Sequence, residues 1–213
     1  MRPIFLLACV AAAVLFAGCG AYANTVEGDV SVPQSNGPNP QNLPDPNAVP
    51  KPNSPGGYPV AISPVTIEEV ALGQQWIELY NASAFEADIG GWALTDGQHS
   101  HTFPFGFRLA SGSRVVVHLG VAGVDTNSEQ FAPSFAGVNV TQGALALVRG
   151  GGELMHFVQW GADNQPFEGA AVQIGLWTAG DFVSAPGQQD SMNYDGTAND
   201  SSAWHALNPT PGN

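Results

Sequence analysis

Apolar and polar residues alternate along most of the chain between Tyr58 and Asn213. The apolar positions of each run fall on one face of an extended chain: Ile77 with Leu79, Trp92 with Leu94, Val115 with Val117 and Leu119, Leu145 with Leu147, Met155 with Phe157, and Val172 with Ile174. A period of two is typical of strands with one buried face, and no window has the spacing of an amphipathic helix. The pattern therefore predicts an all-β domain over residues 58–213.

Turn-forming residues separate these runs at short intervals. Asp96-Gly97, Ala110–Ser113 and Gly150–Gly152 are examples, and the glycine run divides two strand-like segments as a hairpin loop would. Short strands with frequent turns favour a β-sandwich or a barrel. About 155 residues is an ordinary size for a single domain with its own core.

Residues 1–23 have the pattern of a signal peptide. Arg2 supplies a minimal positive charge, and an unbroken apolar run follows from Ile4 to Ala17. This run is shorter than the roughly 20 residues that a membrane-spanning helix needs. It therefore predicts a secretory leader and an exported protein.

Two processing sites compete at the end of this leader. Phe16-Ala17-Gly18-Cys19 resembles a bacterial lipobox, although Phe16 stands where an aliphatic residue is usual, whereas Ala21-Tyr22-Ala23 resembles an ordinary cleavage site that would leave Asn24 as a free N-terminus. We favour the lipobox, which predicts lipidation of Cys19 and attachment to a membrane. Gly20 rather than Asp follows the cysteine, which favours the outer membrane. Cleavage before Asn24 would instead predict a secreted protein.

Residues 24–57 are rich in proline and asparagine and show no apolar periodicity. Such a segment has no core to bury, so we expect a disordered tether. In the polyproline II conformation it would reach on the order of 100 Å at about 3.1 Å per residue.

The charge balance and the cysteines exclude some functions. The chain has 18 acidic and 5 basic residues, and its formal net charge is −13. Binding to nucleic acid draws much of its free energy from cations that neutralise phosphates, so no nucleic-acid partner is expected. Cys9 and Cys19 both lie in the leader, so the domain has no disulfide and no thiolate metal site.

Several pieces of the domain resemble the lamin tail domain family. Ile67-Glu68-Glu69-Val70, Trp76–Asn81 (WIELYN) and Asp88–Asp96 (DIGGWALTD) are similar to the opening of that domain. Later pieces follow in the same order and include Trp160-Gly161 and the ending Asn208–Asn213. The resemblance covers about residues 60–213.

This resemblance implies an immunoglobulin-like β-sandwich, and it implies no enzyme. Bacterial relatives occur on exported proteins, sometimes joined to hydrolases as accessory modules. Met192-Asn193-Tyr194 departs from the family because many bacterial members carry an arginine there, so no ligand role of that arginine applies to this chain.

Several aromatic and polar residues are candidates for binding. Trp76 and Trp92 could line a sugar-binding face, but a core position is the preferred interpretation for Trp92. Glu78 and Asn81 are expected to satisfy backbone groups at a strand end rather than bind a ligand. His99 and His101 would lie on the same side of a strand and could hold a metal ion, but without a third ligand we prefer a hairpin tip.

Acidic residues and asparagines gather near the C-terminal end. Asp190, Asp195 and Asp200, together with Asn193 and Asn199, offer the oxygen ligands that calcium prefers. The spacing of an EF-hand loop is not met, and these residue types also dominate plain turns. We therefore predict no metal or other cofactor, with calcium at these aspartates as the alternative.

No arrangement of residues indicates catalysis. The sequence has no Gly-x-Ser-x-Gly elbow, no His-Glu-x-x-His motif and no phosphate-binding glycine loop. Glu68 and Glu69 are adjacent, so on a regular strand they would face opposite ways and could not act as a pair. The sequence predicts a non-enzymatic binding or structural module displayed as a lipoprotein. The alternatives are a calcium- or carbohydrate-dependent adhesion domain and an accessory subunit that recruits an exported hydrolase.

Overall fold

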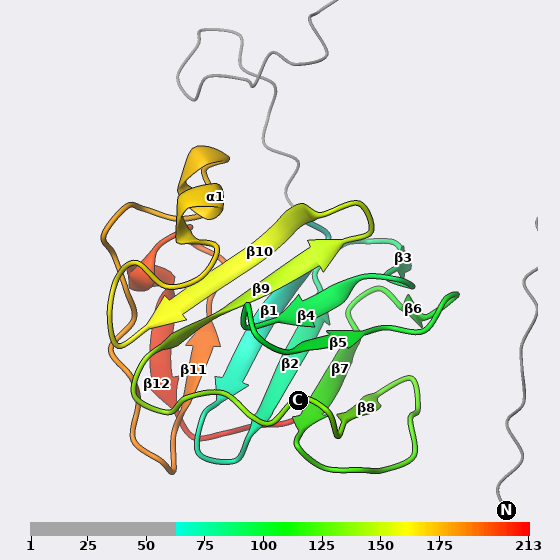
Figure 1. Cartoon of the computed structure of the whole chain (residues 1–213). Helices are drawn as coiled ribbons and strands as arrows, with labels where there is room; N and C mark the ends of the chain where they lie inside the picture. The colour runs from blue at the N-terminus through cyan, green and yellow to red at the C-terminus, as the bar shows by residue number, and fades with distance from the viewer. Residues whose placement is uncertain (1–62) are drawn as a thin grey trace, which may run out of the picture. The chain divides into compact units, whose positions relative to one another are not determined.

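The computed structural model describes residues 63–213 (Figure 1). The predictions for the signal peptide, for Cys19 and for the tether over residues 24–57 lie outside this range. The described residues form strands β1 (Val65–Ala71), β2 (Trp76–Asn81), β3 (Ala87–Asp88), β4 (Ala93–Thr95), β5 (Ser100–Thr102), β6 (Arg108–Leu109), β7 (Arg114–Leu119), β8 (Glu129–Ala132), β9 (Gly143–Arg149), β10 (Glu153–Trp160), β11 (Ser191–Tyr194) and β12 (Trp204–Leu207). Two short helices complete the set, α1 (Glu168–Gln173) and the 3-10 helix η2 (Ser201–Ala203).

Two β-sheets pack face to face. The larger sheet has the strand order β12-β11-β1-β2-β7-β8, and the smaller has the order β10-β9-β4-β5. Figure 1 shows the smaller sheet lying across the strands of the larger one. Side chains from the two inner faces form one apolar core. The predicted immunoglobulin-like β-sandwich is confirmed.

The period of two correctly identifies the inner face of the larger sheet. Ile77 and Leu79 of β2 and Val115 and Val117 of β7 are fully buried in the core. The turns also lie where the sequence predicts them, and Gly150–Gly152 connects β9 to β10 as a hairpin. Gly151 and Gly152 have φ of 99° and 91°, a backbone conformation that other residues rarely adopt.

One prediction about the fold is wrong, because Val172 and Ile174 do not lie on a strand. Val172 belongs to α1, and Ile174 ends that helix. The side chain of Glu168 holds the region together by accepting the backbone N–H groups of Asn164 and Gly180. A six-residue helix fixed by such contacts is too short for a helical period to be recognised. Within residues 63–213, no helix is long and apolar enough to cross a bilayer.

The prediction that Glu68 and Glu69 face opposite ways is also wrong. The register of β1 and β2 shifts between Ile67, which pairs with Leu79, and Glu69, which pairs with Glu78. One extra residue in β1 forms a β-bulge, and a bulge redirects side chains. Glu68 and Glu69 both act on Glu78, on the outer face of the sheet.

The C-terminal segment returns across the larger sheet. After β12 it runs past the ends of β11, β1 and β2 towards β7 (Figure 1). The backbone N–H of Thr210 donates to Glu69 at 3.0 Å, and that of Gly212 donates to Glu78. These bonds fix the segment against the outer face.

Candidate functional site

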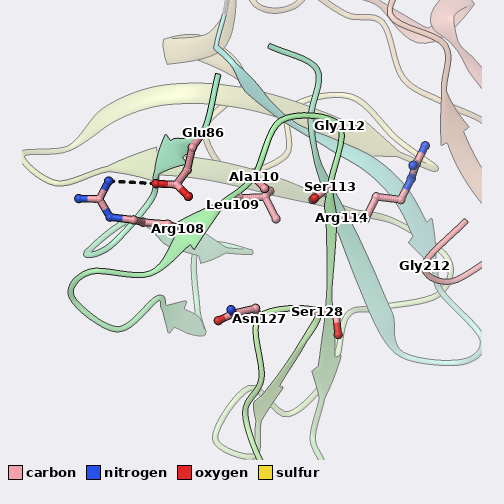
Figure 2. A pocket seen from close by; sticks show the side chains of 10 residues that line it. All are labelled: Glu86, Arg108, Leu109, Ala110, Gly112, Ser113, Arg114, Asn127, Ser128 and Gly212. Atoms are coloured by element: carbon pink, nitrogen blue, oxygen red, sulfur yellow. Dashed lines mark hydrogen bonds and ion pairs between the residues drawn. The ribbon is translucent and has the colours of Figure 1, made fainter. Parts of the chain in front are cut away.

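One hollow, of about 470 Å³, lies at the end of the sandwich beside the turn between β6 and β7 (Figure 2). Two arginines of the described domain line it, Arg108 from β6 and Arg114 from β7. The rest of the wall is mainly backbone and small side chains, including Ala110, Ser113 and Gly212. In a chain with a formal net charge of −13, such a pair of cations raises the question of an anion site.

The two arginines do not converge on this hollow. Figure 2 shows their side chains pointing to opposite sides. Arg108 pairs with Glu86 at 3.1 Å, and Arg114 forms two hydrogen bonds with Glu68 at 2.7 and 2.9 Å. Each guanidinium is therefore already neutralised by a carboxylate of the domain. The geometry supports a structural role for both arginines and no anion site.

A group of three carboxylates lies on the outer face of the larger sheet; we call Glu68, Glu69 and Glu78 the outer-face cluster. Arg114 joins two of them, with its Nε 3.3 Å from Glu78 Oε1. Glu69 accepts hydrogen bonds from the hydroxyl of Ser191 at 2.5 Å and from the hydroxyl of Thr210 at 3.1 Å. The cluster thus links β1, β2, β7 and β11 to the C-terminal segment.

Burial makes the carboxyl group of Glu78 a weaker acid than usual. Its side chain is 1 % exposed, and burial raises the pKa of Glu78 to about 7, with further contributions from the charges of Glu68 and Glu69. The backbone N–H of Gly212 and the charge of Arg114 oppose this rise. Among residues 63–213, no group of three or more His, Cys, Asp or Glu side chains has the arrangement of a metal site. The cluster can clamp the C-terminal segment, and Glu78 can exchange a proton near neutral pH.

Both predicted tryptophans are buried, each 6 % exposed. The core position predicted for Trp92 is confirmed. Trp76 lies on the outer face and packs with Ala71 and Val116 in a small separate cluster. Neither ring is open to a sugar.

Glu78 and Asn81 satisfy backbone groups, as the sequence predicts. The amide of Asn81 donates to the carbonyls of Phe85 and Leu109 at 2.8 Å each and so fixes the loop after β2. Glu78 accepts from Gly212.

The two histidines of the β4–β5 hairpin make separate contacts. His99 lies at the tip, where its Nδ1 is 3.0 Å from Asp96 Oδ2. His101 lies on β5 with its ring edge-on to Phe103, at a centroid distance of 5.0 Å. Burial lowers the pKa of His101. The structure brings no third ligand to this pair within the described range.

The three aspartates considered for calcium are spread out. Asp190 precedes the four residues of β11 and Asp195 follows them, a separation of roughly 15 Å at about 3.3 Å per residue. Asp195 accepts bonds from Thr197 and His205, which lower the pKa of Asp195 to about 2. Asp200 caps η2. Asp195 and Asp200 thus stabilise local turns, as Asp commonly does.

Sequence reasoning missed a second, smaller hollow of about 260 Å³. Its wall combines β1, β10, the loop after β11 and Leu176 beyond α1. A single histidine, His156, lies at this wall within the apolar strand β10. A lone histidine in such a strand gives no signal of a site, because the hollow exists only once four distant segments meet.

The fold and these contacts define an immunoglobulin-like β-sandwich of the binding or structural kind, whose charged groups serve mainly the fold. Residues 59–162 match the family model described as Lamin Tail Domain, and this stretch belongs to the lamin tail domain family. The match ends just after β10, so α1, β11, β12 and the C-terminal segment lie beyond it. No curated protein matches the chain.

Proposed function

We propose that this protein is a non-catalytic binding or structural module, exported and displayed from the cell envelope through a lipid on Cys19. Three features of the sequence support the display: the signal-peptide pattern of residues 1–23, the lipobox-like sequence before Cys19, and the proline-rich segment over residues 24–57. Such a segment would hold the domain away from the membrane surface.

The observation that carries the non-catalytic role is how the ionisable groups are used. Glu69 and Glu78 hold the C-terminal segment, and Arg114 is paired with Glu68. Catalytic acids, bases and nucleophiles must face a substrate with their hydrogen-bonding capacity available. These groups are instead committed to the fold. A purified protein that turned over a substrate at a rate abolished by one point mutation would overturn this role.

Membrane fractionation tests the display, and the chain provides a matched control. We expect the wild-type protein in the membrane fraction and the Cys19→Ala variant in the soluble fraction. The Cys9→Ala variant should behave as wild type, because Cys9 lies inside the leader that is removed. The mass of the mature N-terminal peptide should correspond to an acylated Cys19; an unmodified peptide that begins at Asn24 would make the protein a secreted domain.

A carbohydrate-binding role is the second candidate, and the smaller hollow favours it because its wall is uncharged and rich in hydroxyl groups. Recruitment of an exported hydrolase stays a prediction: that enzyme should co-purify with the protein from the envelope. A calcium-dependent role also stays a prediction, and the positions of Asp190, Asp195 and Asp200 give it no support.

A further inference from the structure

The smaller hollow opens where two neighbouring strands diverge. β11 pairs with β1 only through Asn193 and Met192, and its last residue, Tyr194, pairs with Trp204 of β12 instead. Among the described residues, no strand pairs with Val65–Ile67 on this side of β1. The loop after β11 leads away from the sheet, and a space remains between it, β1 and β10.

Polar but uncharged groups dominate the wall of this hollow. Ser63, Thr66, Tyr194, Thr197 and Asn199 line it, and no Asp, Glu, Lys or Arg is among the lining residues. The side chains of Ser63, Thr197 and Asn199 each donate a hydrogen bond within the domain. Apolar side chains, Met155 and Leu176 among them, complete the wall. The hollow therefore differs from the surface around it, since the chain carries 18 acidic residues.

His156 provides a fixed hydrogen-bond donor at this wall. The residue is 6 % exposed, and the backbone N–H of Ile67 donates to its Nδ1 at 3.3 Å. Burial lowers the pKa of His156 to about 3, so the ring is neutral at physiological pH. A backbone N–H can only donate, so Nδ1 is unprotonated and the ring proton is on Nε2. Within residues 63–213, the bond from Ile67 is the only hydrogen bond that this ring makes.

Aromatic packing holds the second polar ring of the wall in place. The ring of Tyr194 lies edge-on to His156 at a centroid distance of 4.8 Å and 5.1 Å from the ring of Trp204. Its position is therefore set by these aromatic contacts, and the residue borders the hollow. A rigid aromatic ring beside fixed donors is a preorganised surface for a small ligand.

We propose that this hollow binds one neutral sugar residue. Sugar hydroxyls both donate and accept, which matches a fixed imidazole donor together with the hydroxyls of Thr66 and Tyr194, each of which can do both. The C–H face of the ring can pack against Tyr194 and Met155. An anion would find no cation in this wall, and a cation would find no carboxylate. The volume equals that of roughly nine water molecules at about 30 Å³ each, enough for one ring and too small for a chain.

This inference deepens the proposed binding role and rests on it, and saturation-transfer NMR on the mature protein tests it. The probes are the methyl glycosides of glucose, galactose and N-acetylglucosamine, with glucosamine and glucuronic acid as charged comparators. We expect saturation transfer to the ring protons of at least one neutral glycoside and little to the charged sugars. Tyr194→Phe and Thr66→Val should each weaken binding about fivefold, as expected for one lost hydrogen bond.

Tyr80→Phe is the matched control, because it removes the same hydroxyl from the outer face of the same sheet and should leave binding unchanged. Absence of transfer from every neutral glycoside would overturn the inference, as would equal effects of Tyr194→Phe and Tyr80→Phe. Binding of a short peptide in place of sugars would also overturn the inference. It would indicate that a peptide pairs as an added strand with the open side of β1. A protein that stays in the membrane fraction but binds no sugar would refute only this inference and leave the proposed display intact.

Discussion

Both faces of the six-stranded sheet contain fully buried side chains, but different interactions stabilise them. Leu79 and Glu78 are neighbours on β2, and their exposed fractions are 0 % and 1 %. Leu79 faces an apolar core in which contacts are non-directional. Glu78 faces the C-terminal segment, Glu68, Glu69 and Arg114, where each group needs a partner in a particular place. Burial alone therefore does not distinguish a core position from a hydrogen-bonded polar cluster.

Substitution at the inner face should have the largest effect on stability. Leu79→Ala removes fully buried atoms and leaves a cavity, so we expect it to lower the free energy of unfolding by about 2–5 kcal/mol. Leu207→Ala is the control because Leu207 is 53 % exposed, and its effect should stay within about 0.5 kcal/mol. Urea unfolding followed by tryptophan fluorescence measures both. Similar losses in the two variants would contradict the assignment of the inner face.

Substitution within the outer-face cluster should have an intermediate effect. Glu69→Ala leaves the hydroxyl of Ser191 and both donors of Thr210 without their acceptor, which should cost about 1–3 kcal/mol. Glu86→Ala breaks only the exposed pair with Arg108 and should have a much smaller effect, because exposed ion pairs contribute little to stability. If the two variants unfold at the same urea concentration, the clamp on the C-terminal segment contributes nothing measurable.

The outer face should also respond to pH in a way that the inner face cannot. The pKa of Glu78 rises from an ordinary 4.5 to about 7, so between these values the folded protein holds a proton that the unfolded chain has released. The free energy of unfolding should therefore fall as pH rises through this window and level off above about pH 7. Melting temperatures between pH 4.5 and 8 should show a smaller decline for Glu78→Gln than for wild type. A decline of the same size in both proteins would exclude Glu78 as its source.

The smallest effects are expected where carboxylates only support turns. Asp195→Ala removes an acceptor for Thr197 and a partner for His205, and at so exposed a turn we expect little change in the urea midpoint of unfolding. Calcium should leave the melting temperature of both wild type and Asp195→Ala unchanged. A rise with calcium that disappears in the variant would instead establish the calcium site considered from the sequence.

The inner face could be predicted from the sequence because an apolar residue recurs at every second position of these strands. Val115 and Val117 of β7 illustrate this. Gly151 and Gly152 mark the hairpin between β9 and β10, because few other residues adopt a positive φ. Such signals are local. They depend on a few neighbouring residues and not on contacts with distant parts of the chain.

The outer face and the smaller hollow could not be predicted in the same way. The run Ile67-Glu68-Glu69-Val70 reads the same with or without a bulge, and only pairing with Leu79 and Glu78 shows that one residue is extra. The partners of Glu69 include Ser191 and Thr210, 122 and 141 residues along the chain. His156 likewise becomes part of a hollow only through contacts with β1 and the loop after β11. Contacts between residues so far apart produce no periodic pattern in the sequence.

The return of the C-terminal segment has a consequence for the order of folding during synthesis. β1 is the first of the described strands to be made, yet one of its two neighbours, β11, is made only after all of β2 to β10. Until Thr210 is made, the buried carboxylate of Glu69 lacks two of its donors, and until β11 is made, one edge of β1 lacks its neighbouring strand. Contacts between the two ends of a chain delay closure, and an open edge favours aggregation in the meantime. The domain can therefore complete this part of its fold only after Thr210 and Gly212 have been made.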